Sequence, residues 1–167
     1  MELGLFVVAT ENAMPIDQLA KAAEERGFES LWIPEHSHIP LDSTYPGGVP
    51  IPKDYGNTFD PFVALSIAAA ATSTIRLGTG ICLVIERDAI QTAKAVATLD
   101  LISDGRFEFG IGAGWNQKEM ENHGTVYSTR FAKMKDQILA MRTIWSEEEA
   151  EYHGDFVNFE PMWSWPK

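Results

Sequence analysis

The sequence has 167 residues, enough for one domain with a hydrophobic core. Acidic residues outnumber basic ones by 24 to 13, and the net charge of −11 argues against a basic nucleic-acid-binding face. The single cysteine excludes an internal disulfide framework, and no apolar run approaches the ~20 residues of a membrane span. The N-terminus lacks the basic segment of a signal peptide, so we expect a cytoplasmic protein that acts on a small molecule.

Strand and helix patterns alternate along the chain. Apolar or alternating stretches predict strands at 3–9, 30–34, 75–84 and 106–111. Apolar residues at helical spacing predict helices at about 15–27, 60–72, 88–104 and 128–145, of which the second and third begin with aspartate caps, Asp60 and Asp88. Residues 151–160 surround His153-Gly154-Asp155 and predict a small hairpin.

This alternation predicts an α/β protein whose strands are parallel and joined by right-handed crossovers. An open doubly wound sheet and part of a TIM-type (β/α)8 barrel both fit the pattern. A complete barrel needs about 250 residues, so we expect the first four βα units of one. The sequence then forms a single truncated domain over residues 1–167, and the hairpin at 151–160 begins an insertion.

Ligands of parallel α/β proteins bind at the carboxyl ends of the strands. Here the second strand is followed by Glu35-His36, the third ends in Gly80-Ile81-Cys82, and the fourth leads into Gly112-Ala113-Gly114-Trp115-Asn116. Glycine, aromatic and hydrogen-bonding groups predominate, and no nucleophile stands beside a base. The pattern favours a flat cofactor, with Cys82 as a buried, inert thiol.

His36 invites two other interpretations. It could be a structural histidine that hydrogen-bonds loop backbone, or it could pair with His38 on an extended segment to bind a metal ion. The later strand ends supply no convincing further ligands for a metal hydrolase. The stretch from Gly110 to Trp115 partly mimics a dinucleotide fingerprint, but residues 116–119 are expected to lead into a loop rather than a helix.

Four stretches carry a resemblance to a known family: SLWIPEH, IRLGTGICLV, AKAVATLDLISDGRFEFGIGAGWN and EYHGDFVNFEPMWSWPK. They resemble the bacterial luciferase-like monooxygenase superfamily, and within it the branch that depends on the deazaflavin coenzyme F420. The resemblance runs from Met1 to Lys167. It implies a (β/α)8 barrel with an insertion, of which this chain is the amino-terminal half.

The resemblance also implies site roles. His36 matches the family position beside the deazaflavin ring, where it is the expected catalytic residue, and Glu35 precedes it. Gly80-Ile81 matches a non-prolyl cis peptide that backs the ring, and Trp115 stands where sugar-phosphate-oxidising relatives carry an acidic residue. The expected cofactor-binding set, with no metal ligand, is Glu35, His36, Gly80, Ile81, Cys82, Gly112, Gly114, Trp115 and Asn116.

The implied activity is hydride transfer between coenzyme F420, or alternatively FMN, and a small organic substrate. Two alternatives stay open: a metal-dependent barrel hydrolase that uses His36 and His38, and a catalytically inactive half-barrel that serves as an interaction module. Open sheet edges at residues 3–9 and 106–111 predict self-association, so we expect a homo-oligomer.

Overall fold

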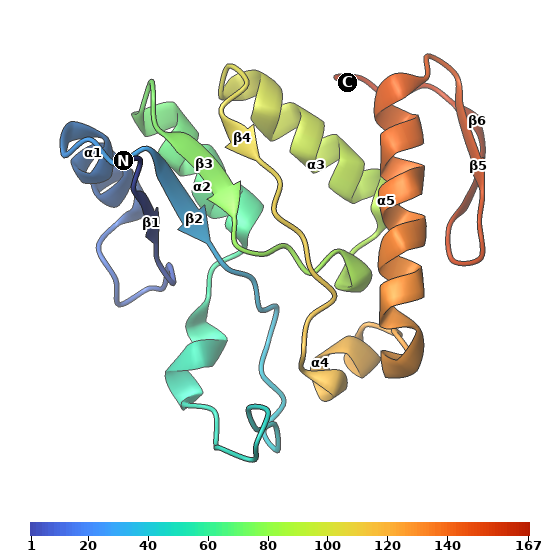
Figure 1. The fold of residues 1–167 in the computed structure, drawn as a ribbon, viewed down its shortest axis with the longest axis horizontal. Helices are drawn as coiled ribbons and strands as arrows, with labels where there is room; N and C mark the ends of the chain where they lie inside the picture. The colour runs from blue at the N-terminus through green and yellow to red at the C-terminus, as the bar shows by residue number, and fades with distance from the viewer. The chain divides into compact units, whose positions relative to one another are not determined.

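The computed structural model describes residues 1–167 (Figure 1). The chain forms two compact units. The first comprises residues 1–82 and 99–111, and the second comprises residues 83–98 and 112–167. Each unit is described by itself below.

The first unit is built on a parallel sheet. Its strands are β1 (Gly4–Phe6), β2 (Ser30–Ile33), β3 (Arg76–Thr79) and β4 (Phe107–Glu108). They lie in the order β1-β2-β3-β4, and every neighbouring pair is parallel. This sequential order confirms the expectation of a partial barrel and excludes the doubly wound alternative, in which the strand order reverses beside the first strand.

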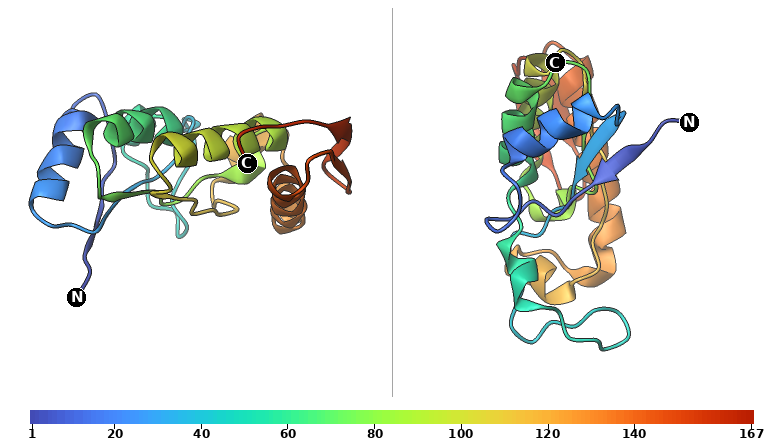
Figure 2. Two further views of the ribbon diagram at one scale, coloured as in Figure 1. Left: turned by 90° about the horizontal axis from the view of Figure 1, so that it is seen from above. Right: turned by 90° about the vertical axis from the view of Figure 1, so that its left-hand side faces the viewer.

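Two helices cover one side of this sheet (Figure 2). Helix α1 (Ile16–Glu25) follows β1, and α2 (Pro61–Ala71) precedes β3. The Asp60 carboxylate accepts a hydrogen bond from Val63 N at 3.0 Å, and Pro61 occupies the first helical position, as the sequence predicts. The intervening segment contains a short 3-10 helix, η1 (Lys53–Asn57).

The two faces of the sheet carry different side chains. Leu31 and Leu77 are fully buried and are in register with Phe107, whose ring contacts Phe62 of α2 at a centroid distance of 6.0 Å. This row therefore faces the helices. Because side chains alternate along a strand, the next row faces the opposite side, where the Trp32 ring lies so close over Gly78 that an added Cβ would be 2.3 Å from it.

Arg106 joins the start of β4 to the end of α2. Its guanidinium donates hydrogen bonds to the carbonyl oxygens of Ala69, Thr72, Ile75 and Ser103 and to the hydroxyl of Thr72. Two of these acceptors lie at the C-terminal end of α2, where carbonyl groups lack partners within the helix and favour a cation. The arginine of the stretch SDGRFEFG thus has a structural role.

The second unit is mainly helical. Its elements are η2 (Val84–Glu86), most of α3 (Ala89–Ile102), α4 (Gln117–Asn122), η3 (Tyr127–Thr129), α5 (Arg130–Ser146) and the strands β5 (Ala150–His153) and β6 (Asn158–Met162). Asp88 caps α3 by accepting from Gln91 N at 2.8 Å, as the sequence predicts. Trp145 of α5 donates to the Ala93 carbonyl of α3 at 3.1 Å.

Strands β5 and β6 form an antiparallel hairpin that Asp136 of α5 holds in place. The Asp136 carboxylate accepts hydrogen bonds from the Tyr152 hydroxyl at 2.7 Å and from the amides of Phe156 and Val157 at 2.8 and 2.9 Å. A Cβ on Gly154 would lie 2.1 Å from the same carboxylate, so only glycine fits there.

The elements differ from the sequence-based predictions in three respects. All four strands are shorter than predicted, most of all β3, which ends at Thr79 rather than at residue 84. The expectation of a loop after Asn116 is wrong, because α4 begins at Gln117. Phe131 belongs to the apolar spacing that predicts a helix at 128–145, and we expect it to be buried, yet it is 58% exposed in α5, whereas Gln137 is buried. No helix combines the length and apolar character that crossing a membrane requires.

Candidate cofactor site

Backbone hydrogen bonds align the carboxyl ends of the strands in the first unit. The Gly80 amide donates to the Ile33 carbonyl at 2.8 Å, which aligns the ends of β2 and β3. The Cys82 amide and the Thr79 hydroxyl both donate to the Gly110 carbonyl, at 2.8 and 2.7 Å. The segments that follow β2 and β3 therefore leave the same edge of the sheet, where the sequence places Glu35-His36 and Gly80-Ile81-Cys82.

The peptide bond between Gly80 and Ile81 is cis, which confirms the expectation that the family resemblance implied. Phe6 lies beside it: a Cβ added to Gly80 would be 3.1 Å from the Phe6 ring. The Phe6 side chain is 57% exposed, so an aromatic surface borders the backbone at this point.

Glu35 and His36 lie at the end of β2, in the positions that the sequence predicts. Glu35 is buried, and His36 is half-buried with its ring centroid 5.2 Å from that of Tyr55. Tyr55 in turn meets Tyr45 edge to face, at a centroid distance of 5.8 Å and an interplanar angle of 81°. Both tyrosines come from the segment between β2 and α2, which thereby joins the candidate site.

The Tyr55 hydroxyl stays protonated at neutral pH. Burial raises its pKa, and the charge of Tyr45 and a hydrogen bond with it raise the pKa further. Tyr55 can therefore act as a hydrogen-bond donor beside His36. Sequence analysis missed both tyrosines because they occur in a segment rich in proline and glycine that has no periodic pattern.

His38 is half-buried, like His36. Its Nδ1 and the hydroxyl of neighbouring Ser37 are 2.8 Å apart, which is a local hydrogen bond between adjacent residues. A group of three imidazole and carboxylate side chains close enough to share a metal ion lies elsewhere, at Glu151, His153 and Glu160, far along the chain. The hypothesis of a metal hydrolase built on His36 and His38 gains no support from this arrangement.

Cys82 is fully buried, as the sequence predicts. It forms a parallel bridge with Ile111, and its amide is engaged with Gly110.

The remaining members of the predicted set, Gly112, Gly114, Trp115 and Asn116, belong to the second unit. Gly114 has a φ of 64°, and a Cβ there would approach Leu83 and Met120 at 2.9 and 3.0 Å. Both the left-handed backbone and the close packing require glycine. Asn116 is buried and caps α4, with its side-chain oxygen 3.4 Å from the Glu119 amide. These roles in the fold exist whether or not a cofactor is bound.

Polar side chains of the second unit also fix the turn before α3. Lys133 donates to the Ile85 carbonyl at 2.8 Å and to the Thr125 hydroxyl at 2.7 Å, and Gln137 donates to the Arg87 carbonyl at 2.8 Å. Burial lowers the pKa of the Lys133 amine, although the charge of Glu86 opposes this shift.

The fold and the strand-end residues define a class of protein, the α/β barrels that bind ligands at the carboxyl edge of a parallel sheet. A family model described as luciferase-like monooxygenase matches residues 1–167. The chain therefore belongs to the luciferase-like monooxygenase family.

Comparison with individual sequences gives the same family. An uncharacterized protein of Mycobacterium tuberculosis is 41% identical over 172 residues, which cover 100% of this chain and 61% of the relative. An F420-dependent glucose-6-phosphate dehydrogenase of Kineococcus radiotolerans is 30% identical, over 95% of this chain and 45% of that protein. A 5,10-methylenetetrahydromethanopterin reductase of Methanolobus tindarius is 29% identical, over 95% of this chain and 43% of that protein.

Solved structures show the same fold. The monooxygenase RslO1 of Streptomyces bottropensis matches with a TM-score of 0.78 and 27% identity, over 96% of this chain and 48% of that one. The coenzyme F420-dependent tetrahydromethanopterin reductase of Methanopyrus kandleri matches with a TM-score of 0.69 and 25% identity, over 95% of this chain and 44% of that one. The chain thus spans about half the length of most of these relatives, and 61% of the mycobacterial one.

Proposed function

We propose that this chain contributes the His36 site of an oxidoreductase that transfers hydride between coenzyme F420 and a small organic substrate, with FMN as the alternative cofactor. The observation that carries the proposal is the position of His36. His36 follows β2 at the sheet edge where the Gly80 amide donates a hydrogen bond to the Ile33 carbonyl. The relatives of this chain include F420-dependent enzymes of Kineococcus radiotolerans and Methanopyrus kandleri.

The residues at this edge fit a flat heterocycle. Phe6 offers a half-exposed aromatic surface. The His36 imidazole and the Tyr55 hydroxyl can donate hydrogen bonds to the carbonyl groups and nitrogens of such a ring. Glu35, which directly precedes His36 in the sequence, is buried. This donor set suits a neutral ring system better than a metal ion, because a metal site needs several anionic or imidazole ligands that converge.

A bound deazaflavin or flavin supplies the hydride chemistry through its own ring. The chain then has to bind and orient that ring and to exclude water. In the proposed site His36 holds a polar atom of the ring by a hydrogen bond, and Tyr55 packs against the imidazole and limits its rotation. Phe6 and the backbone at Gly80-Ile81 provide the surface against which the ring lies. No side chain has to act as a nucleophile.

The test is a pair of binding titrations. Coenzyme F420 and FMN are added separately to the chain, and binding is followed by the change in cofactor fluorescence. We expect F420 to bind more tightly than FMN and His36→Ala to weaken binding more than the matched variant His38→Ala. Loss of one hydrogen bond to a buried polar partner corresponds to about 1–3 kcal/mol, which is roughly 5- to 150-fold in affinity.

Other outcomes identify the alternatives. If His38→Ala is the more damaging change, and elemental analysis finds zinc that is lost in His38→Ala but kept in His153→Ala, the metal hydrolase replaces the oxidoreductase. If neither cofactor binds to this chain or to a longer protein that contains it, the unit is an interaction module. The substrate, the direction of hydride transfer and the expected self-association are tested separately, by activity assays and by light scattering.

A further inference from the structure

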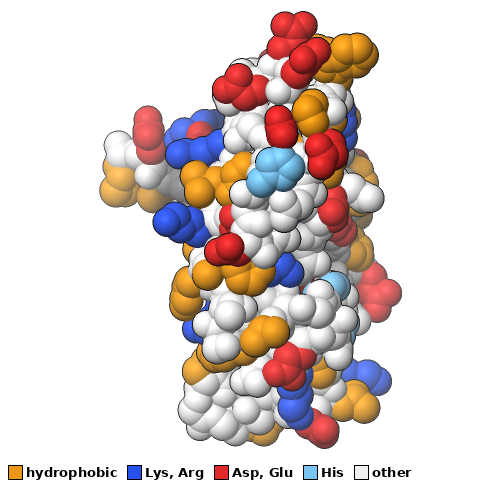
Figure 3. All heavy atoms as spheres, turned by 90° about the vertical axis from the view of Figure 1, so that its right-hand side faces the viewer, with side chains coloured by type: hydrophobic (Ala, Val, Ile, Leu, Met, Phe, Trp, Pro, Cys, Tyr) orange, Lys and Arg blue, Asp and Glu red, His pale blue; other side chains and the backbone are white.

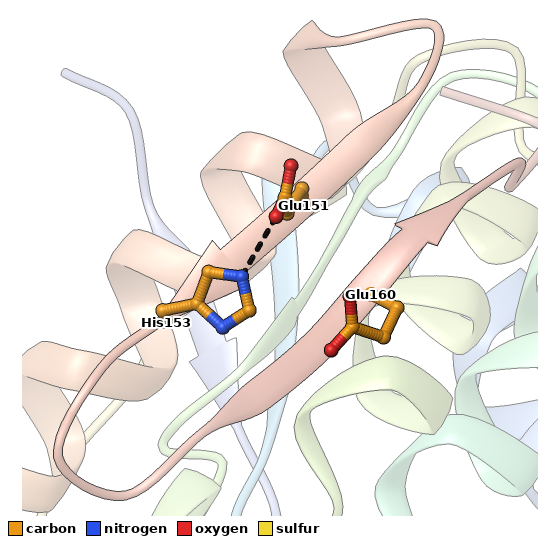
Figure 4. Close-up of side chains that lie close together, drawn as sticks. All are labelled: Glu151, His153 and Glu160. Atoms are coloured by element: carbon orange, nitrogen blue, oxygen red, sulfur yellow. Dashed lines mark hydrogen bonds and ion pairs between the residues drawn. The ribbon is translucent and has the colours of Figure 1, made fainter.

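The hairpin carries three side chains of the types that bind metal ions, remote in sequence from the candidate cofactor site (Figure 4). Glu151 and His153 lie two residues apart on β5, and Glu160 lies on β6. Their ligand atoms, one from each residue, all lie within 4.8 Å of one another. All three side chains are exposed, and acidic side chains with a histidine among them are visible in Figure 3.

The backbone that carries these side chains is fixed from the other face of the hairpin. Tyr152 and Phe159 alternate with the three residues, and their ring centroids are 6.1 Å apart. The Tyr152 hydroxyl donates to Asp136 of α5, which also binds the two amides at the hairpin turn. The outward face is therefore presented on a rigid support.

Asn158 sets the orientation of the His153 ring. The amide nitrogen of Asn158 donates to the Gly154 carbonyl at 2.9 Å, so its amide oxygen faces His153 and accepts from Nδ1 at 3.0 Å. Nε2 is thereby directed at the Glu151 carboxylate, 2.8 Å away. Metal-binding histidines characteristically donate their second ring N–H to an oxygen in this way, which fixes the ring and leaves the other nitrogen as the ligand.

We propose that His153 Nε2, Glu151 and Glu160 form a Zn²⁺ site that bridges the two strands of the hairpin. One imidazole and two carboxylates satisfy the nitrogen and oxygen preferences of zinc, and three protein ligands leave a fourth, solvent-facing position for water. Mg²⁺ and Ca²⁺ fit less well, because they prefer oxygen ligands alone.

The geometry requires only a small closure. Two ligand atoms bound tetrahedrally to one zinc ion lie roughly 3.4 Å apart, given metal–ligand distances of about 2.1 Å. Separations of at most 4.8 Å then have to shrink by no more than about 1.4 Å, which exposed glutamate side chains can achieve by rotation. In the metal-free hairpin Nε2 of His153 carries a proton and donates it in the hydrogen bond to Glu151. Zinc takes the place of that proton, which is released to the buffer.

Calorimetric titration of the metal-free chain with ZnCl2 tests the site. We expect one Zn²⁺ per chain, with proton release that shows in buffers of different ionisation enthalpy. His153→Ala should weaken binding at least tenfold, and His153→Gln provides a second variant of similar size. Asn158→Ala should weaken binding 10- to 100-fold without changing the ligands themselves. Co²⁺ in place of zinc should give the visible absorption of a four-coordinate ion.

A matched pair of double variants separates ligation from general attraction by negative charge. E151Q/E160Q removes two ligands, whereas E148Q/E149Q removes the same charge from the neighbouring exposed run. We expect the first pair to abolish saturable binding and the second to change affinity by less than twofold. The proposal is overturned if zinc does not saturate at one site, if both pairs weaken binding equally, or if both His153 variants bind as the parent does.

Discussion

Arg106 binds Thr72 twice, donating from Nη1 to the side-chain hydroxyl at 3.0 Å and from Nη2 to the main-chain carbonyl at 3.2 Å. The same guanidinium reaches the carbonyls of Ala69 and Ile75. It therefore connects the end of α2, the start of β3 and the start of β4. Part of the stretch that carries the family resemblance serves the fold rather than the cofactor.

Replacement of Arg106 should destabilise the first unit. Arg106→Ala leaves several part-buried carbonyl groups without their charged donor, and we expect the free energy of unfolding to fall by about 2–3 kcal/mol. The stability of Arg106→Lys should lie between those of the parent and Arg106→Ala, because the lysine ammonium keeps the charge but cannot reproduce the planar fork of donors. Urea unfolding measures the change, and Arg142→Ala, at an exposed position of α5, is the control. Equal stability of the two alanine variants would contradict this role.

The lowered pKa of the Glu24 carboxyl makes the stability of the fold depend on pH. Burial raises the pKa of its carboxyl, but hydrogen bonds from the amides of Ile75, Thr74 and Ser73 and from the Thr74 hydroxyl outweigh this and lower it from 4.5 to about 2. Because the folded-state pKa is the lower one, the stabilisation is complete above about pH 4.5 and is lost as the pH falls from 4.5 toward 2.

Glu24→Gln should therefore flatten the dependence of stability on pH within that window. The measurement is the urea midpoint between pH 2 and 6 for the parent and the variant. Glu25→Gln changes the adjacent exposed carboxylate and should leave the profile of the parent unchanged. A profile of Glu24→Gln as steep as that of the parent would show that other carboxylates cause the acid sensitivity.

The Asp136 carboxylate controls the ionisation of Tyr152. Burial, the hydrogen bond to Asp136 and the negative charges of Asp136 and Asp155 together raise the pKa of Tyr152 to about 12. Asp136→Asn should lower this pKa toward the ordinary value of 10 and cost about 1 kcal/mol of stability. Spectrophotometric titration of the tyrosines measures the first effect. Asp155→Asn, which removes a charge but not this hydrogen bond, should produce a smaller decrease.

The sequence predicted the order of the strands in the parallel sheet and the starts of α2 and α3, because these depend on local signals. The starts of α2 and α3 are marked by Asp60, with Pro61 after it, and by Asp88. Each aspartate caps its helix by a hydrogen bond to an amide three residues further on. The end of β3 could not be predicted in this way. The predicted strand continues from Ile75 to Val84, but the regular strand ends at Thr79, and beyond it the backbone forms only the isolated bridge between Cys82 and Ile111.

The missed features depend on contacts that no short pattern contains. Helix α4 is short and polar, so it lacks an apolar period, and its start is marked only by the Asn116 cap. Gln137 is buried and donates to the Arg87 carbonyl, 50 residues away in sequence, whereas Phe131, part of the apolar spacing that predicts α5, is exposed. The candidate site behaves in the same way: His36 was predicted from its strand end, but its neighbour Tyr55 was not.

Tyr55 provides the last prediction, which rests on the proposed function. Its ring meets that of His36 at 5.2 Å with an interplanar angle of 52°, and this contact holds the segment between β2 and α2 against the site. An aromatic pair contributes about 0.5–1.5 kcal/mol, so Tyr55→Leu should weaken coenzyme binding roughly 2- to 12-fold. Tyr55→Phe keeps the ring and should change affinity by less than twofold if packing alone matters.

Two readouts distinguish packing from hydrogen bonding. Limited proteolysis of residues 37–59 should accelerate in Tyr55→Leu and not in Tyr55→Phe, because only the former releases the segment from His36. If Tyr55→Phe instead loses coenzyme affinity while its proteolysis is unchanged, the hydroxyl donates to the ring directly and Tyr55 is a binding residue. If both variants bind and resist proteolysis as the parent does, Tyr55 does not position His36.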